Sequence, residues 1–213
     1  MYETQQTQSP SASEGPPPGK PSLDIRPATF EEMGAVAGFV RSSADWYRPF
    51  VAEQDMAEHE VGEAWARKNF ELRDFYVGRE GDEPIGTISI QYFGDWAYLG
   101  YIYLDVDHVG KGHGRRLIRF AESVIRKRGA RGMTLIAHPE ATWAKKAYLK
   151  YGFRIAETDK ERVLAWEGGV LRPYYEEGFE LYVYDFARIA RGLDTPGLCS
   201  SSSYDDDARE AAQ

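Results

Sequence analysis

The 213-residue sequence has only one cysteine, Cys199, and this scarcity excludes two classes of site. An internal disulfide needs a pair of cysteines, and a zinc site of the Cys-x-x-Cys type needs at least two. Its four histidines have no partners at metal-ligand spacing, so we expect no metal. Cys199 stands beside a run of serines, where we interpret it as an incidental exposed thiol.

Basic charge and long apolar runs are also scarce. There are 26 Lys and Arg against 34 Asp and Glu, a net charge of −8, which disfavours nucleic acid and anionic membranes as partners. No apolar run approaches the ~20 residues of a membrane-spanning helix. The opening residues lack the basic start and apolar stretch of a secretory signal. We therefore expect a cytoplasmic protein.

The composition predicts one folded domain between two tails. Hydrophobic residues make up 42% of the chain, enough for a substantial core. Residues 1–21 are rich in Pro and Ser and are predicted to be disordered, and residues 187–213 form a flexible tail rich in Ser and Asp. The domain is expected to span residues 22–186.

Hydrophobic periodicity predicts that strands and helices alternate along this domain. The expected strands cover 23–26, 75–79, 85–92, 98–106, 133–137, 153–165 and 180–186. One helix is expected to begin at a capping box formed by Thr29 and Glu32, and further helices at 55–72, 115–128 and 141–151. Because hairpins interrupt the alternation, the fold class is a mixed α/β (α+β) sheet.

The most informative stretch follows the strand that is expected to end at Val106. Three glycines stand at alternate positions, 110, 112 and 114, and a helix begins at once. Unpaired N–H groups at a helix start, together with the positive end of its dipole, form an anion site, usually for phosphate. Gly112 follows Lys111 where a Walker loop requires Ser or Thr, and the dinucleotide fingerprint also fails.

About thirty residues later the chain continues Ala-Lys-Lys-Ala-Tyr-Leu-Lys-Tyr-Gly-Phe, from 144 to 153. Together with the glycine loop, this segment resembles the GCN5-related N-acetyltransferase (GNAT) superfamily over nearly the whole folded part. The resemblance implies a single domain whose central, mostly antiparallel sheet splays at the cofactor site and is flanked by helices. It also implies acetyl-CoA as acyl donor.

Position by position, the resemblance implies roles for individual residues. Leu104 and Val106 offer backbone groups to pantetheine, and Tyr148 donates a hydrogen bond to the leaving thiol. The cradle for the pyrophosphate consists of Val109, Gly110, Lys111, Gly112, His113, Gly114 and Arg115.

Four features depart from the family pattern. Val109, Val106 and Ala141 stand where Gln or Arg, proline and asparagine are common. The strand 98–103 has no acidic residue to serve as general base. Lys111, Arg115 or Arg116 supplies positive charge in place of the missing contacts.

The alternative bases lie at the ends of two strands: Asp105, Asp107, His138 and Glu140. We favour His138 because its ordinary pKa near 6.5 suits proton transfer at neutral pH.

The acceptor pocket is the least determined region. Segments 42–50 and 166–178 are aromatic and interrupted by Pro or Gly, so they form either its walls or a homodimer contact. The leading hypothesis is an N-acetyltransferase acting on a primary amine of a small molecule or protein. The alternative is a non-catalytic acyl-CoA-binding or sensing module, and transfer of a longer acyl group also stays open.

Overall fold

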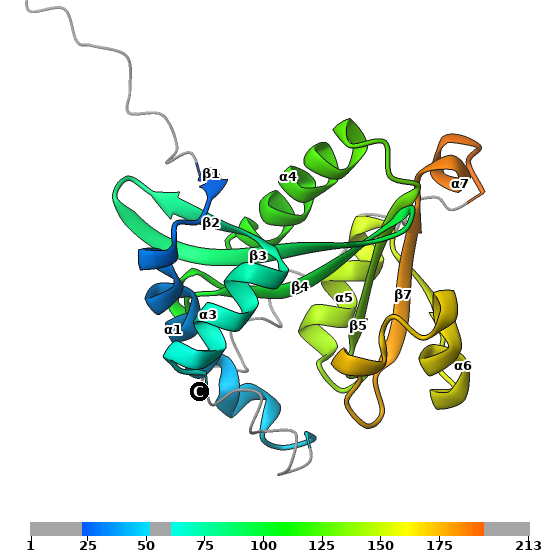
Figure 1. Ribbon diagram of the computed structural model, residues 1–213, viewed down its shortest axis with the longest axis horizontal. Helices are drawn as coiled ribbons and strands as arrows, with labels where there is room; N and C mark the ends of the chain where they lie inside the picture. Colours follow the sequence, from blue (N-terminus) through cyan, green and yellow to red (C-terminus); the bar gives the residue numbers. More distant parts are fainter. Residues whose placement is uncertain (1–22, 52–60, 194–213) are drawn as a thin grey trace, which may run out of the picture.

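The computed structural model describes residues 23–51 and 61–193, which form a seven-stranded sheet flanked by helices (Figure 1). The strand order is β1-β2-β3-β4-β5-β7-β6, and the only parallel pair in it joins β4 to β5. The bounds are β1 Asp24–Pro27, β2 Asp74–Glu80, β3 Glu83–Phe93, β4 Trp96–Leu104, β5 Gly132–Ala137, β6 Arg154–Glu157 and β7 Glu180–Asp185. The predicted fold class is confirmed. The expected N-terminal tail, most of the C-terminal one and Cys199 lie outside the described residues.

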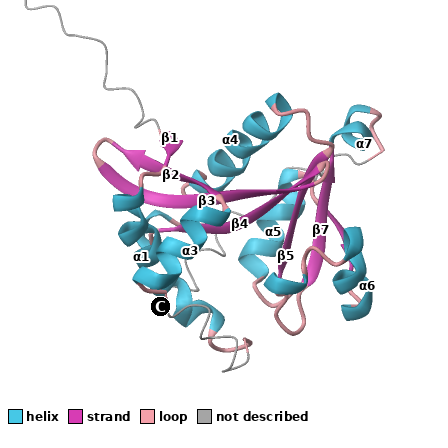
Figure 2. Ribbon diagram, in the orientation of Figure 1, coloured by secondary structure: helices cyan, strands magenta, loops and turns pink. Residues whose placement is uncertain are grey.

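Helices cover both faces of the sheet (Figure 2). Their bounds are α1 Met33–Tyr47, α3 Glu63–Leu72, α4 His113–Lys127, α5 Thr142–Tyr151, α6 Lys160–Ala165 and α7 Phe186–Ala190. Successive side chains of a strand point to opposite faces. In β2, Phe75 and Val77 accordingly pack in a cluster with residues of α1 and α3, whereas Tyr76 packs with residues of α4.

The α4 helix supplies much of the core beneath the glycine loop. Its buried residues Leu117, Ala121 and Ile125 recur at helical spacing and pack against β3, β4 and β5. Burying one such Leu or Ile side chain contributes about 1.5–3 kcal/mol. This packing fixes the start of the helix, where the predicted anion site lies.

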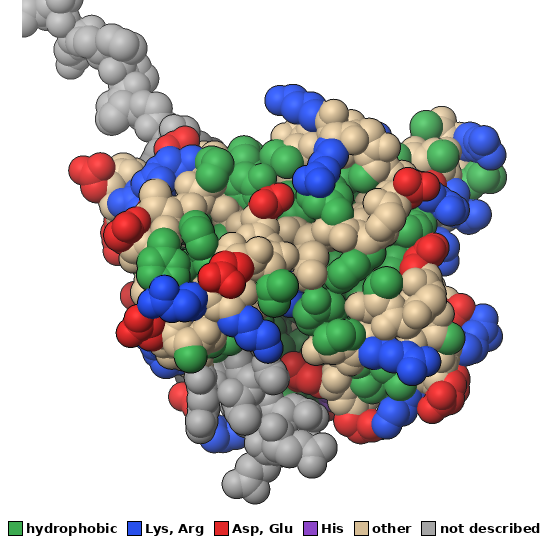
Figure 3. Space-filling model, in the orientation of Figure 1, with side chains coloured by type: hydrophobic (Ala, Val, Ile, Leu, Met, Phe, Trp, Pro, Cys, Tyr) green, Lys and Arg blue, Asp and Glu red, His purple; other side chains and the backbone are tan. Residues whose placement is uncertain are grey.

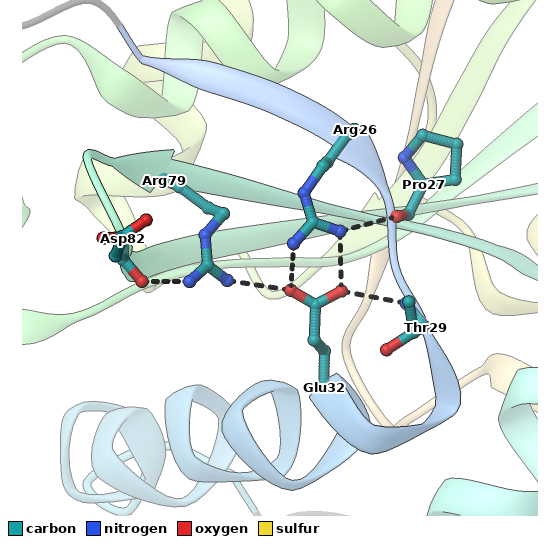
Figure 4. A network of polar contacts seen from close by, with 6 residues as sticks. All are labelled: Arg26, Pro27, Thr29, Glu32, Arg79 and Asp82. Carbon is teal, nitrogen blue, oxygen red and sulfur yellow. Dashed lines mark hydrogen bonds and ion pairs between the residues drawn. The ribbon is translucent and has the colours of Figure 1, made fainter.

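The start of α1 is tied to β1 and β2 through Glu32 (Figure 4). Its carboxylate accepts the Thr29 N–H at 2.9 Å, one half of the predicted capping box, and pairs with Arg26 (2.9 Å) and Arg79 (2.8 Å). Burial alone would raise the Glu32 pKa, but the Thr29 N–H and the guanidinium groups outweigh it, and the pKa lies below its ordinary value. The network fixes the direction in which α1 leaves the sheet.

The largest differences from the expected boundaries concern three segments. The predicted strand 153–165 is wrong, because β6 ends at Glu157 and α6 follows. The Asp159 side chain accepts the Arg162 N–H at 3.1 Å and caps α6, a signal present in the sequence. The predicted helix 55–72 is α3 over its second part, and residues 52–60 fall outside the described ranges. Helix α7 crosses the expected domain end at residue 186.

The described residues lack the features of a membrane-spanning helix and of a metal site. In the described part of the chain, no helix is long and apolar enough to cross a membrane, and no cluster of His, Cys, Asp or Glu is placed to hold a metal. On the face that Figure 3 shows, basic and acidic side chains are interspersed, and neither sign forms a single patch.

Candidate active site

The sheet opens between β4 and β5. The two strands pair only from Trp96 to Tyr98, and in Figure 1 they meet near α7 and diverge away from it. Tyr101 explains the divergence: its φ of 47° is rare for a bulky residue, and the register with β3 shifts at this point. A bulge there bends β4 away from β5. Beyond Tyr98, the edge of β4 toward β5 has no ladder partner in the described sheet.

A cavity of about 230 Å³ lies at this opening. Its walls come from the end of α1, residues 98–103 of β4, residues 135–138, α5 and residues 173–176. Tyr47 belongs to the predicted segment 42–50, and residues 173–176 belong to segment 166–178. Both aromatic segments therefore contribute to the cavity wall, whereas the homodimer contact stays a prediction.

The glycine loop leads directly into α4. Gly110 (φ 80°) and Gly112 (φ 84°) adopt left-handed conformations, and no atom lies within 4 Å of where a Cβ would stand at either. The first helical hydrogen bond runs from the Arg116 N–H to the Gly112 carbonyl at 3.3 Å. The three preceding N–H groups, those of residues 113–115, therefore have no acceptor within the helix, so the start of α4 suits an anion.

The His113 ring turns away from the loop surface. It is 4% exposed, its Nε2 lies 3.3 Å from Glu80 Oε1, and its Nδ1 is buried without a hydrogen-bond partner. Burial lowers the His113 pKa from its ordinary 6.5, Glu80 opposes this effect, and Arg116 adds to it. The ring thus fixes the loop to the end of β2, and only its backbone N–H belongs to the predicted cradle.

The other predicted coenzyme residues lie within this loop or just before it. Leu104 ends β4 and pairs with Gly86, whereas Val106 is exposed in a 3₁₀ turn, because the strand ends two residues earlier than expected. The side chains of Val109, Lys111 and Arg115 are exposed, and Gly114 lies in the first turn of α4. Their contacts with the coenzyme stay predictions.

Tyr148 projects from α5 and lines the cavity. Its ring packs on Tyr182 (5.7 Å between centroids) and Phe153 (6.1 Å). Burial, and then the neighbouring Tyr47 and Tyr98, raise the pKa of Tyr148 well above 10. The hydroxyl therefore keeps its proton at neutral pH and is suited to donate a hydrogen bond.

Three of the four predicted bases lie outside the cavity lining. Asp105 accepts the Asp107 N–H at 3.0 Å and lies 3.3 Å from His108 Nδ1, so its carboxylate stabilises its own turn. Asp107 and Glu140 are exposed. None of them is among the described residues that line the cavity.

His138 does line the cavity, stacked on Phe50 at 4.8 Å between ring centroids. Its Nδ1 accepts the Glu140 N–H at 3.2 Å. The neutral ring consequently carries its proton on Nε2, and its basic nitrogen already has a donor.

Two charged residues of the cavity wall are not among the predicted site residues. Glu176 lies in segment 166–178, whose glutamates favour a cationic amine acceptor. Burial, and then the charge of Glu176, raise the pKa of Tyr47 to about 12, and both residues line the cavity. Arg73, between α3 and β2, had no local signal at all, because its neighbours are brought to it by distant strands and loops.

Known proteins share sequence with this chain over much of its length. Residues 39–153 match the model of the acetyltransferase (GNAT) family. The spermidine N(1)-acetyltransferase of Thermoplasma acidophilum is 23% identical over 148 residues, covering 65% of this chain and 92% of that protein.

Solved structures share the fold. The PaiA N-acetyltransferase of T. acidophilum, in complex with coenzyme A, superposes with a TM-score of 0.61 at 19% identity, covering 78% of this chain and 99% of that one. The N-acetylglutamate synthase of Neisseria gonorrhoeae, complexed with coenzyme A and N-acetyl-glutamate, gives 0.58 at 13% identity, covering 78% of this chain and 35% of that one.

Proposed function

This chain belongs to the GNAT acetyltransferase family, and we propose that it transfers the acetyl group of acetyl-CoA to a primary amine of a small molecule. The family and the enzyme class expected from the glycine loop and the 144–153 segment are confirmed. The main support for a small acceptor is the cavity at the β4–β5 opening, which places Tyr148 beside the unpaired edge of β4. The same strand leads from this cavity to the glycine loop.

The proposed step is direct attack. The amine nitrogen forms a bond to the thioester carbonyl carbon, the carbon–sulfur bond breaks, and coenzyme A leaves as thiolate. The N–H groups of residues 113–115 hold the pyrophosphate, and the Tyr148 hydroxyl donates to the sulfur. Moving the proton fully from a phenol of pKa 10 or more to a thiolate of pKa 8.5 costs at least about 2 kcal/mol. We therefore assign Tyr148 as a hydrogen-bond donor to developing charge.

The amine must also lose a proton. An ordinary amine of pKa near 10.4 is neutral in only about one molecule in ~2,500 at pH 7, a cost of roughly 4.6 kcal/mol. His138 stays a predicted base, but its Nδ1 already accepts the Glu140 N–H. Glu176 adds a second candidate from the same cavity, since a carboxylate both attracts the ammonium group and accepts its proton.

Two measurements test this function. Calorimetry with acetyl-CoA and with free coenzyme A is expected to show binding, and a coupled assay of thiol release over a panel of primary amines is expected to show turnover. Binding without turnover on any amine would favour the sensing alternative. No heat of binding to either coenzyme would overturn the proposed cradle.

A further inference from the structure

Arg73 carries a buried charge that no carboxylate among the described residues neutralises. Its residue exposure is 8%, yet among the residues the structure describes it forms no ion pair. The one hydrogen bond of its side chain there runs from Nε to Asn69 Oδ1, at 3.2 Å. A buried cation is costly unless it is paired, so an arginine in this state favours an anion from outside the chain.

The arrangement around Arg73 orients its guanidinium group. The carbon at the centre of the group lies over the rings of Tyr174 (4.6 Å), Tyr101 (4.9 Å) and Tyr98 (5.7 Å). Ring faces attract a cation but accept no strong hydrogen bonds from its N–H groups. With Nε committed to Asn69, the two terminal nitrogens keep the forked geometry that suits a carboxylate.

Gly100 of β4 makes room for this group. A Cβ at Gly100 would stand 2.8 Å from one terminal nitrogen of Arg73, so any side chain there would displace the guanidinium. Arg67, on the same helix as Asn69, is different: it is exposed and pairs with Glu63 at 3.0 Å. Burial without an anion thus distinguishes Arg73 from its neighbouring arginine.

Glu176 places the opposite charge in the same cavity. Of the described residues that line it, Arg73 and Glu176 alone belong to the Asp, Glu, Lys and Arg types. We infer that the acetyl acceptor is an amino acid, whose carboxylate binds Arg73 and whose amine lies toward Glu176. This inference rests on the proposed function. A polyamine, with cationic groups and no anion, would be repelled by Arg73.

The test compares each amino acid with the amine that lacks its carboxylate. Phenylalanine is paired with 2-phenylethylamine, leucine with 3-methylbutylamine and lysine with cadaverine, and spermidine is added. We expect kcat/KM to be about 10- to 100-fold higher for the preferred amino acid than for its decarboxylated partner, as a charged hydrogen-bond pair provides. This comparison uses the unaltered protein and does not depend on whether a variant folds.

Two variants test whether Arg73 causes the preference for the amino acid over its decarboxylated partner. Arg73→Gln is expected to remove this preference by lowering kcat/KM for the amino acid alone. Arg73→Lys is expected to retain part of it, since the charge remains but the forked guanidinium group is lost. The matched control, Arg67→Gln, removes an exposed arginine and is expected to retain the full preference. Thermal unfolding and acetyl-CoA binding are measured on all three variants.

The outcomes separate this inference from the proposed function. Equal or better acetylation of the decarboxylated amines or spermidine overturns the amino-acid acceptor while leaving the acetyltransferase intact. A panel in which no amino acid binds or is acetylated overturns it as well. So does an Arg73→Gln variant in which kcat/KM falls equally for an amino acid and for its decarboxylated partner. Failure to bind acetyl-CoA in the unaltered protein would instead remove the proposed function itself.

Discussion

The glycine loop, proposed to bind the coenzyme, and the cavity, proposed to bind the acceptor, are built in opposite ways. The loop is one continuous segment, Val109 to Arg115, whose proposed contacts are mainly backbone N–H groups. The cavity is assembled from residues of α1, β4, β5, α5 and loops that are far apart in the sequence. The loop depends on glycine conformations, whereas the cavity depends on how the sheet and helices bring distant residues together.

This difference separates two kinds of specificity. Backbone donors at a helix start bind a phosphate without regard to the rest of the ligand, which suits a coenzyme. We propose that side chains such as Arg73 and Glu176 distinguish one acceptor from another, because a charged group of the acceptor is attracted by one of them and repelled by the other. A change in the loop is therefore expected to alter coenzyme affinity, and a change in the cavity to alter turnover or acceptor choice.

The largest expected effect is that of Tyr148→Phe, in the cavity. Removing the hydroxyl deletes the proposed hydrogen bond to the leaving sulfur, so kcat should fall about 10²- to 10⁴-fold. The affinity for acetyl-CoA, measured by calorimetry, should stay unchanged because the loop is untouched. Tyr151→Phe is the control: Tyr151 lies on the same helix but donates its hydroxyl to Glu122. A normal kcat in Tyr148→Phe would exclude Tyr148 from the chemistry.

Local patterns in the sequence were sufficient for the loop. Alternate glycines after a strand predicted a helix start with unpaired N–H groups, and Gly110 and Gly112 have the left-handed conformations that only glycine adopts easily. Most strands and helices were also predicted, because periodicity reports burial directly. The error at 153–165 arose because apolar residues continue past Glu157, although Asp159 stands where it caps the helix that begins there.

The cavity was only partly predictable for a physical reason. The aromatic segments 42–50 and 166–178 were predicted as possible walls of the pocket. No short-range sequence pattern, however, indicates that Arg73 lies near Gly100 or that Glu176 lies near Tyr47. These pairs meet through the bulge at Tyr101 and the tertiary packing of α1 and α3. Tertiary contacts of this kind leave no periodic trace in one sequence.

The next largest effect is expected for Gly112→Ala, in the loop. A methyl group at this position meets no atom within 4 Å, so the cost is only that of a left-handed conformation, about 1–2 kcal/mol. Relaxing that strain turns the N–H groups away, and the Kd for acetyl-CoA should rise about 5- to 30-fold. Saturating coenzyme should restore kcat, which distinguishes this variant from Tyr148→Phe.

Gly129→Ala is the matched control for that variant. Gly129 follows the other end of α4, has a φ of 79°, and likewise has open space around its would-be Cβ. Both substitutions should lower the midpoint of thermal unfolding similarly, since they carry the same kind of strain. If Gly129→Ala weakens acetyl-CoA binding as much as Gly112→Ala does, global destabilisation explains the loss, and the loop has no special part in it.

The smallest effect is expected for His113→Gln, which tests whether the loop binds the coenzyme through its backbone N–H groups without the His113 ring. Because burial lowers the folded-state pKa of His113 below 6.5, the unfolded chain binds the proton more tightly. The contribution of His113 to the free energy of unfolding is therefore fully present above pH 6.5, and it decreases as the pH falls from 6.5 through the folded-state pKa. Urea unfolding of His113→Gln should show a weaker decrease over this window. Its acetyl-CoA affinity at pH 7.5 should match that of the unaltered protein, since the substitution retains the N–H at position 113. A large loss of affinity at that pH would mean that the ring, held by Glu80, shapes the cradle as much as the glycines do.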